Sequence, residues 1–168
     1  MSEIVHPIPP VFDEHSEILI LGSFPSVKSR EAGFFYGHPQ NWFWKTLAGV
    51  LGLPVPVTVE EKRRFLLLHH IALWDVAASC EITGSADSSM KRVIPNDLSP
   101  IFQRSEIKAV FVNGKTAEKY YRQLLQPVYH REAVCLPSTS PANAARSLPD
   151  LIAEWSVIRV YLSVFVDR

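Results

Sequence analysis

Chemically useful side chains gather in one stretch of this sequence, between residues 22 and 45. Tyr36 and Asn41 lie there beside Gly37 and Pro39, a setting that fits a buried core poorly. The face of an aromatic ring stacks on a nucleobase, and an amide offers both a hydrogen-bond donor and an acceptor. Core packing around a helix start is the alternative for the neighbouring aromatics. These are Phe34, Phe35, Trp42, Phe43 and Trp44.

Two later segments combine polar side chains with turn residues. Asn113, Gly114 and Lys115 form either a helix start that binds an anion or a base edge, or a plain turn. Residues 136–143 place hydroxyl groups between two prolines. They form either a rigid loop that hydrogen-bonds phosphates and presses small side chains into a groove, or an ordinary polar turn. The sequence alone leaves both alternatives open.

Four short apolar runs lead into polar or small residues. They are residues 18–21, 71–74, 109–112 and 133–136. An all-apolar run of this length is typical of a strand that is buried on both faces of a parallel sheet. Because ligands of such sheets bind outside the carboxyl ends of the strands, we expect the chemistry at the ends of these runs.

Helical patterns separate the apolar runs. Thr58 and Glu61 form a capping-box pattern before a leucine-rich segment, and residues 115–126 continue the third run as a helix. The last helix is expected to start with Ser147 as its cap and Pro149 in its first turn. This alternation predicts a three-layer α/β/α sandwich with a central, mostly parallel four-stranded sheet.

Length and composition limit the class of protein. A chain of 168 residues with 47% hydrophobic residues fits one globular domain over residues 1–168. Cys80 and Cys135 are too few and too far apart for a four-cysteine iron–sulfur cluster or a zinc ribbon. We therefore expect no metal, no cofactor and a reducing, cytoplasmic setting. No apolar stretch approaches the roughly 20 residues that cross a bilayer, so we expect no membrane contact. We also expect a monomer.

The charges of the chain cancel, with seventeen basic and seventeen acidic residues. Phosphate binding usually shows as a basic excess, so this balance counts against DNA as a partner unless cations form a local patch. Lys28, Arg30, Lys45 and Lys115 flank the predicted cleft and could form that patch. Solvated surface charge is the alternative for each of them.

The order and spacing of several segments resemble the uracil-DNA glycosylase superfamily, most closely its hypoxanthine-DNA (deoxyinosine) glycosylase branch. The similarity runs from about Leu19 to Trp155. The segments that carry it are LGSFPS at 21–26, FYGHPQNWFW at 35–44, LWDV at 73–76, SCE at 79–81, GSADS at 84–88, PND at 95–97, NGK at 113–115 and LPSTSPAN at 136–143.

One departure from the superfamily decides the branch. The resemblance implies an Asp or Asn that positions water in the loop after the first strand, and Phe24 stands at that position here. An uncharged aromatic ring cannot orient water. The resemblance to the hypoxanthine branch implies that the Asn of a Pro-x-Asn segment takes this role, and Asn41 matches that Asn. The resemblance therefore makes Asn41 the expected catalytic residue and Phe24 a wall of the base pocket.

The resemblance also implies roles for the rest of the site. Tyr36 is expected to stack on a base flipped out of the DNA, with packing against Phe24 as the alternative. Asn113 is expected to distinguish the six-position oxygen of hypoxanthine from the amino group of adenine, with Ser23 supporting base recognition. DNA contacts are expected from Ser138, Thr139, Ser140, Pro141, Asn143, Lys28 and Lys45.

Several ionisable groups keep open roles. The second motif of the superfamily normally holds a His that residues 136–143 lack. His38 is either its replacement or, more often for such a residue, a structural hydrogen-bonding group. Asp75, Asp87 and Asp97 lie at expected strand ends and loops, where one could act as a general base. Asp87 is preferred among the three, with a helix cap as its alternative.

The resemblance implies a monofunctional DNA glycosylase of base-excision repair. Such an enzyme flips out a deaminated base, expected here to be hypoxanthine, and hydrolyses its N-glycosyl bond in DNA. One alternative is a glycosylase for uracil or xanthine. Another is a nucleic-acid-binding module on the same fold that lacks catalysis because Phe24 replaces the usual polar group. No lysine stands out as a Schiff-base nucleophile, so lyase activity is not expected.

Overall fold

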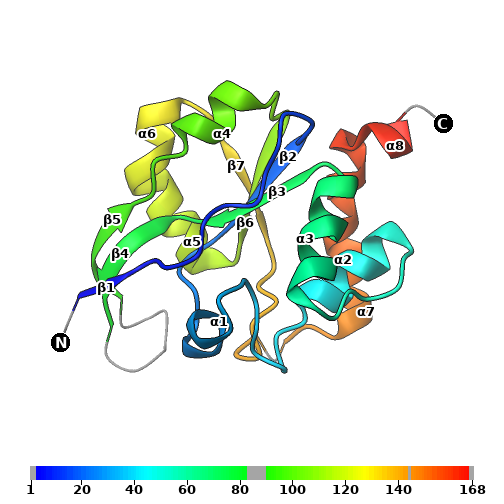
Figure 1. Cartoon of the computed structure of the whole chain (residues 1–168), viewed down its shortest axis with the longest axis horizontal. Helices are drawn as coiled ribbons and strands as arrows, with labels where there is room; N and C mark the ends of the chain where they lie inside the picture. Colours follow the sequence, from blue (N-terminus) through cyan, green and yellow to red (C-terminus); the bar gives the residue numbers. More distant parts are fainter. Residues whose placement is uncertain (1–2, 83–89, 144, 167–168) are drawn as a thin grey trace.

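The centre of the protein is a parallel sheet of four strands (Figure 1). The computed structural model describes residues 3–82, 90–143 and 145–166. The strands are β2 (Ile18–Gly22), β3 (Ile71–Asp75), β6 (Ala109–Asn113) and β7 (Ala133–Leu136). They lie side by side in the order β3-β2-β6-β7, and every neighbouring pair is parallel. All four predicted strands are confirmed.

Helices cover both faces of this sheet (Figure 1). Ile18 and Ile20 of β2 face one core with Phe111, while Leu19 and Leu21 face a second core on the other side. The first core lies under α2 (Phe43–Leu51), α3 (Val59–Leu68), α7 (Leu148–Trp155) and the 3-10 turn η3 (Ser156–Tyr161), which continues into α8 (Ser163–Val166). The second lies under α4 (Ser99–Arg104) and α5 (Lys115–Tyr120). The predicted α/β/α sandwich is confirmed.

The helix ends follow the local sequence signals. Thr58 and Glu61 form the predicted capping box of α3, and Ser147 caps α7 with Asp150 as its partner. The segment 115–126, predicted as one helix, is not a single regular α-helix in the structure. A π-helical turn, η2 (Tyr121–Leu125), separates α5 from α6 (Gln126–Tyr129). Pro127 has no N–H to donate back along the helix, which explains why the regular bonding pattern is interrupted just before it.

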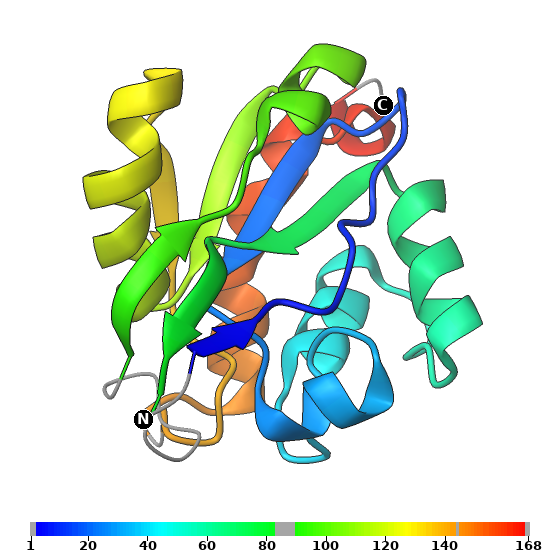
Figure 2. The ribbon, with the colours of Figure 1, turned by 60° about the vertical axis from the view of Figure 1, so that its left-hand side comes forward.

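A second, antiparallel sheet was not expected from the sequence. It consists of β1 (Glu3–Val5), β4 (Ala77–Glu81) and β5 (Lys91–Pro95) in the order β1-β4-β5, and Figure 2 shows these strands side by side. Only Val76 separates β4 from β3. The Val76 N–H donates to the carbonyl of Gly22, so the chain passes β2 as it bends into the second sheet. Because β1 pairs with β4, this bend also brings residues 3–8, the N-terminal arm, towards the carboxyl ends of the parallel strands.

A charge cluster ties the opposite end of the sheet to the C-terminal segment. Glu17 is 9% exposed and accepts hydrogen bonds from Lys108 (2.6 Å), His70 (2.9 Å) and Ser163 (3.0 Å). Burial alone would raise the pKa of Glu17. The hydrogen bonds from Lys108, His70 and Ser163 outweigh it and lower the pKa from 4.5 to about 2.

Glu17 should therefore make the stability of the protein depend on pH. A folded-state pKa below the ordinary value stabilises the fold fully above about pH 5, and the effect is lost as the pH falls towards 2. We expect Glu17→Gln to lower the free energy of unfolding at pH 7 by about 2–3 kcal/mol and to flatten its decline below pH 5. Urea unfolding at several pH values measures this. Glu14→Gln, at an exposed carboxylate nearby, should change neither quantity.

Within the part of the chain that the structure describes, no helix is long and apolar enough to cross a membrane.

Candidate active site

A cleft of about 1010 Å³ opens at the carboxyl ends of the parallel strands, where the sheet topology predicts a ligand site. The residues at the carboxyl end of each of the four strands contribute to its wall. The lining segments are residues 22–26, Asp75, residues 113–116 and residues 136–143, joined by Tyr36, His38 and Asn41.

Asn41 lies at this cleft just before α2, and its amide is held in one orientation. Its Oδ1 accepts hydrogen bonds from the Phe43 backbone N–H (3.0 Å) and the Thr139 hydroxyl (2.8 Å). A backbone N–H can only donate, so the accepting atom must be the oxygen of the amide. The Asn41 Nδ2 group has no hydrogen-bond partner among the described residues. It is the donor that Asn41 can offer to a ligand.

Thr139 hydrogen-bonds both Asn41 and Asn113 and so connects the segments that carry them. It is 2% exposed, and its hydroxyl accepts from Asn113 Nδ2 (3.0 Å) while donating to Asn41. Its N–H donates to Asn113 Oδ1 (3.1 Å), and its carbonyl accepts from the Trp42 N–H (3.1 Å). The chain segments that follow β2, β6 and β7 are thus joined through one buried residue.

Asn113 is placed at the cleft, as expected, but its amide is already used. Nδ2 donates to the Tyr36 hydroxyl (3.2 Å) and to the Thr139 hydroxyl, and Oδ1 accepts from the Thr139 N–H. The geometry supports a positioning role for this side chain. A base-reading role stays a prediction, and it would require one of these bonds to be exchanged.

Tyr36 has a strained backbone and a supported ring. Its φ is 52°, in the left-handed region where residues other than glycine are uncommon. Its ring stacks on Phe43, with centroids 4.1 Å apart and planes 14° apart. The Trp44 indole holds the preceding turn by donating to the Phe35 carbonyl (3.2 Å). Phe34, Phe35, Phe43 and Trp44 are core residues, which confirms the packing alternative for them.

Phe24 and Ser23 are buried residues in the wall of the cleft. Phe24 is 7% exposed, and its ring meets the edge of His6 at 5.7 Å between centroids and the guanidinium of Arg30 at 5.8 Å. Ser23 is equally buried, and its carbonyl accepts from the Ala77 N–H (3.1 Å). Both residues line the cleft.

The loop at the fourth strand exit is rigid because its own side chains hold its turns. The Ser140 N–H donates to Ser138 Oγ (3.1 Å), the Ala142 N–H donates to Ser140 Oγ (3.2 Å), and Asn143 Nδ2 donates to the Ser138 carbonyl (2.9 Å). Pro141 is exposed between them. The Trp155 indole of α7 anchors the start of the loop at Pro137.

The predicted cations do not all reach the cleft. Arg30 and Lys115 line it. Lys28 lies on α1 (Val27–Ala32), 3.9 Å from Glu31, and Lys45 is exposed on α2; neither is among the lining residues. Arg146, which sequence reasoning did not single out, lines the cleft beside Glu154.

The remaining ionisable candidates separate clearly. His38 Nδ1 accepts from the Gln40 N–H (3.1 Å), which fits a structural role in the turn. Asp97 is exposed and is not among the residues that line the cleft. Its Oδ1 accepts from the Ser99 N–H and the Tyr129 hydroxyl, and the hydrogen bonds from Ser99 and Tyr129 lower its pKa. Asp87 lies outside the described residues. Of the other two, Asp75 lines the cleft and is 3% exposed.

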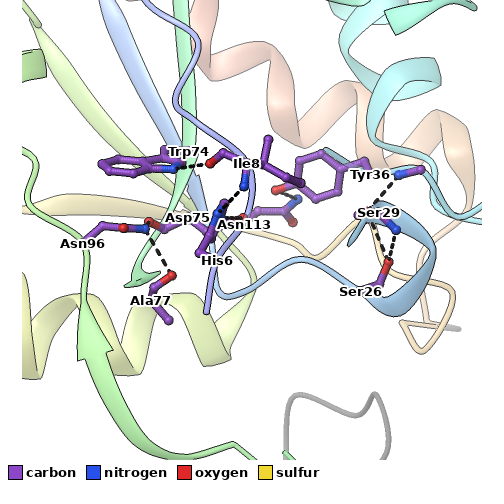
Figure 3. Close-up of polar contacts among 11 residues, drawn as sticks. His6, Ile8, Ser26, Ser29, Tyr36, Trp74, Asp75, Ala77, Asn96 and Asn113 are labelled. Carbon is purple, nitrogen blue, oxygen red and sulfur yellow. Dashed lines mark hydrogen bonds and ion pairs between the residues drawn. The ribbon is translucent and has the colours of Figure 1, made fainter. Parts of the chain in front are cut away.

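Asp75 is paired with a residue that no sequence pattern pointed to. His6 Nε2 lies 2.8 Å from Asp75 Oδ2, although 69 positions separate the two in the chain (Figure 3). Asn96 Nδ2 holds the backbone around Asp75 by donating to the carbonyls of Asp75 (2.8 Å) and Ala77 (3.1 Å). The sequence signals at Asp75 were an acidic residue at a strand end and its place in the LWDV segment, and neither pointed to His6. Within residues 3–82, 90–143 and 145–166, no three His, Cys, Asp or Glu side chains are grouped to hold a metal ion.

Comparisons with known proteins agree with this geometry. The family model described as the uracil DNA glycosylase superfamily matches residues 9–159. Hypoxanthine DNA glycosylases of Methanosarcina barkeri and Methanosarcina acetivorans are each 35% identical to this chain, over 88% and 89% of it and 93% and 94% of their own lengths. A solution NMR structure of a candidate uracil DNA glycosylase from Methanosarcina acetivorans matches with a TM-score of 0.76 at 32% identity. That match covers 92% of this chain and 99% of the other.

Proposed function

The chain belongs to the uracil DNA glycosylase superfamily, and we propose that it excises hypoxanthine from DNA with Asn41 as its catalytic residue. It is a DNA glycosylase that removes a deaminated base, so its substrate is DNA. Two relatives named hypoxanthine DNA glycosylase, similar over most of the chain, support this function. The proposal adds the preferred base, the residues and the monofunctional, hydrolytic mechanism.

The reaction sets three tasks for the cleft. The bond between C1′ of the sugar and the base nitrogen breaks, the oxygen of a water molecule joins C1′, and a proton of that water passes to the departing base or to solvent. The sugar gains oxocarbenium character on the way. The protein must therefore hold the base outside the helix, position the water, and stabilise the changing charges.

Asn41 is suited to positioning the water. An amide is not basic enough to remove a proton from water, so its contribution must come from orientation. The Nδ2 group can donate to one lone pair of the water and leave the other directed at C1′. Because Phe43 and Thr139 occupy the oxygen of the amide, this donor is oriented before the substrate arrives. Preoriented dipoles are a main source of catalysis in enzymes.

The observation that carries the proposal is the hydrogen-bonded chain from Asn113 through Thr139 to Asn41. It joins the segments that follow β2, β6 and β7, and it presents one amide donor to a cleft that is large enough for a base. Around it, we propose that Tyr36 stacks on the flipped base, that Phe24 and Ser23 form the pocket wall, and that residues 138–143 contact the DNA backbone.

One assay tests the proposed function. Duplexes that carry a single 2′-deoxyinosine, 2′-deoxyuridine or 2′-deoxyxanthosine are incubated with the protein and then treated with alkali, which breaks the strand at an abasic site. We expect breaks first at inosine and only after alkali. Absence of breaks in all three duplexes would contradict glycosylase activity. Breaks without alkali would contradict the monofunctional mechanism.

We further propose that the protein acts as one domain over residues 1–168, as a monomer in the cytoplasm. One continuous three-layer core around the four-stranded sheet supports the single domain. Size-exclusion chromatography with light scattering measures the mass in solution, for which one copy corresponds to 19.0 kDa.

A further inference from the structure

We propose that the Arg30 guanidinium stabilises the negative charge that the departing base gains when its bond to the sugar breaks. This inference rests on the proposed function and adds a residue to its mechanism. Arg30 stands in the last turn of α1, on the segment that follows β2, and it lines the cleft beside Phe24. It therefore belongs to the same wall that we propose for the base pocket.

The charge of Arg30 is not compensated within the protein. Its Nε atom is buried and has no hydrogen-bond partner. Among the described residues, no carboxylate forms an ion pair with its guanidinium. Buried donors in proteins are nearly always satisfied, so an exception in the wall of a cleft indicates a group that a ligand completes. Because arginine does not lose its proton in proteins, that ligand must accept hydrogen bonds from a permanent cation.

The Phe24 ring fixes the position of this cation. The guanidinium carbon of Arg30 lies 5.8 Å from the centroid of the ring, which is 7% exposed. The backbone N–H of Arg30 donates to the Ser26 carbonyl (2.9 Å), so the residue is also held within α1. A cation is attracted by the face of an aromatic ring, and this contact occupies none of its N–H groups. The donors of Arg30 therefore stay available while the cation is held in place.

The other cationic candidates at the cleft differ from Arg30. Arg146 is paired with Glu154, 2.6 Å away, and Lys115 is exposed. His38 Nδ1 accepts from a backbone N–H, so this nitrogen carries a lone pair and the ring is neutral. Arg30 is half-buried and unpaired. Since electrostatic interactions are stronger away from water, its position suits a charge that forms inside the pocket.

The reaction creates such a charge. When N9 of hypoxanthine separates from C1′, both electrons of the bond stay on the purine. The oxygen of water joins C1′, and a proton of that water passes to the base or to solvent. The carboxylate of Asp75, 3% exposed, lines the same cleft and opposes the charge on the purine. A fixed guanidinium offsets this repulsion and lowers the energy of the transition state. Asn41 acts on the water, so the two residues serve opposite ends of the breaking bond.

Exchanging Arg30 for methionine removes the charge and the donors but keeps an unbranched side chain. We expect the single-turnover rate of hypoxanthine excision to fall by about a hundredfold or more in R30M. Arg30→Lys, which keeps the charge without the planar group, should restore part of the loss. Arg63→Met is the matched control, because Arg63 is exposed, lies 5.3 Å from the centroid of Phe34 and is not among the lining residues. It should excise within about twofold of wild type. A wild-type rate in R30M overturns the inference.

A second measurement tests the charge of the ligand directly and needs no turnover. Free hypoxanthine is titrated into the complex of the protein with a duplex that carries a tetrahydrofuran abasic site, at several pH values. We expect the wild-type complex to bind hypoxanthine more tightly as the pH rises and the free base loses a proton, and R30M to lack this trend. The other titratable groups at the cleft are the same in both proteins, so they do not produce the difference. They include His38, Asp75, Lys115, Glu118, Cys135 and Glu154. A purely structural role of Arg30 predicts the same trend in both complexes.

A contact between Arg30 and a DNA phosphate would give a different result. The tetrahydrofuran duplex has the backbone but no base, so R30M should bind it within about twofold of wild type and with the same dependence on salt. A loss of tenfold or more with a shallower salt dependence means that Arg30 neutralises a phosphate, and this overturns the inference. Wild-type binding of hypoxanthine that does not strengthen with pH overturns it even if R30M does not fold. A wild-type protein that releases no base from any duplex overturns the proposed function itself.

Discussion

Replacing Asn41 by alanine is expected to lower the single-turnover rate of hypoxanthine excision by about a hundredfold or more while the protein stays folded. The substitution removes the oriented Nδ2 donor, and with it the group that holds the water against the sugar. It also leaves the Thr139 hydroxyl without its acceptor, but Asn41 is partly exposed, so solvent can replace that bond. Quench-flow or manual sampling of an inosine duplex under enzyme excess measures the rate.

The matched control for Asn41 is its neighbour Gln40. Gln40 carries the same amide group, is exposed, and is not among the residues that line the cleft. We expect Gln40→Ala to excise hypoxanthine within about twofold of the wild-type rate. If Asn41→Ala keeps full activity while Gln40→Ala behaves as a control should, Asn41 is not the catalytic residue.

The elements that the sequence predicted well depend on short-range signals. The runs at 18–21 and 109–112 are apolar without interruption, and a strand buried on both faces is the structure that satisfies such a run. Thr58 and Ser147 cap their helices through residues three positions later. Each of these signals lies within one element, so no knowledge of the tertiary structure is needed to use it.

The second sheet shows where such reasoning stops. Residues 77–81 mix alanine, serine, cysteine and glutamate without a clear alternation, and residues 3–5 are too short to show one. These strands form because β3 passes directly into β4 and offers an edge to the N-terminal arm. A pairing between segments more than 70 positions apart leaves no local pattern.

The same limit explains which part of the site was predictable. Asn41 and Tyr36 were found because family resemblance and turn residues marked their segment. Asp75 was visible as one of three acidic residues and as part of the LWDV segment. Its pairing with His6 was not, because the fold brings the two together from 69 positions apart. Thr139 was expected to contact DNA, and that role remains a prediction. Its burial and its four hydrogen bonds give it a second role inside the protein.

Thr139→Val should separate these two roles. Valine keeps the shape of threonine but removes the hydroxyl that accepts from Asn113 and donates to Asn41. A buried N–H without an acceptor costs about 1–3 kcal/mol, so we expect the free energy of unfolding in urea to fall by that amount. Asn41 keeps its bond from the Phe43 N–H but loses the second bond that fixed its plane. We therefore expect the excision rate to fall by about tenfold or more, because a small misplacement of a positioning group is costly.

Thr139→Ser distinguishes loss of the hydroxyl from loss of packing. Serine retains the hydroxyl and loses only a methyl group, so we expect an excision rate close to wild type with a modest loss of stability. Rescue by serine, with failure of valine, would mean that the hydroxyl acts through Asn41. If valine is unstable yet excises hypoxanthine at the wild-type rate, Thr139 holds the loop together without orienting the catalytic amide. If both variants bind abasic DNA weakly, the contact with the DNA backbone is its main contribution. The orientation of Asn41 thus rests on a side chain 98 positions away, and the rates of these variants measure how much of the catalysis depends on it.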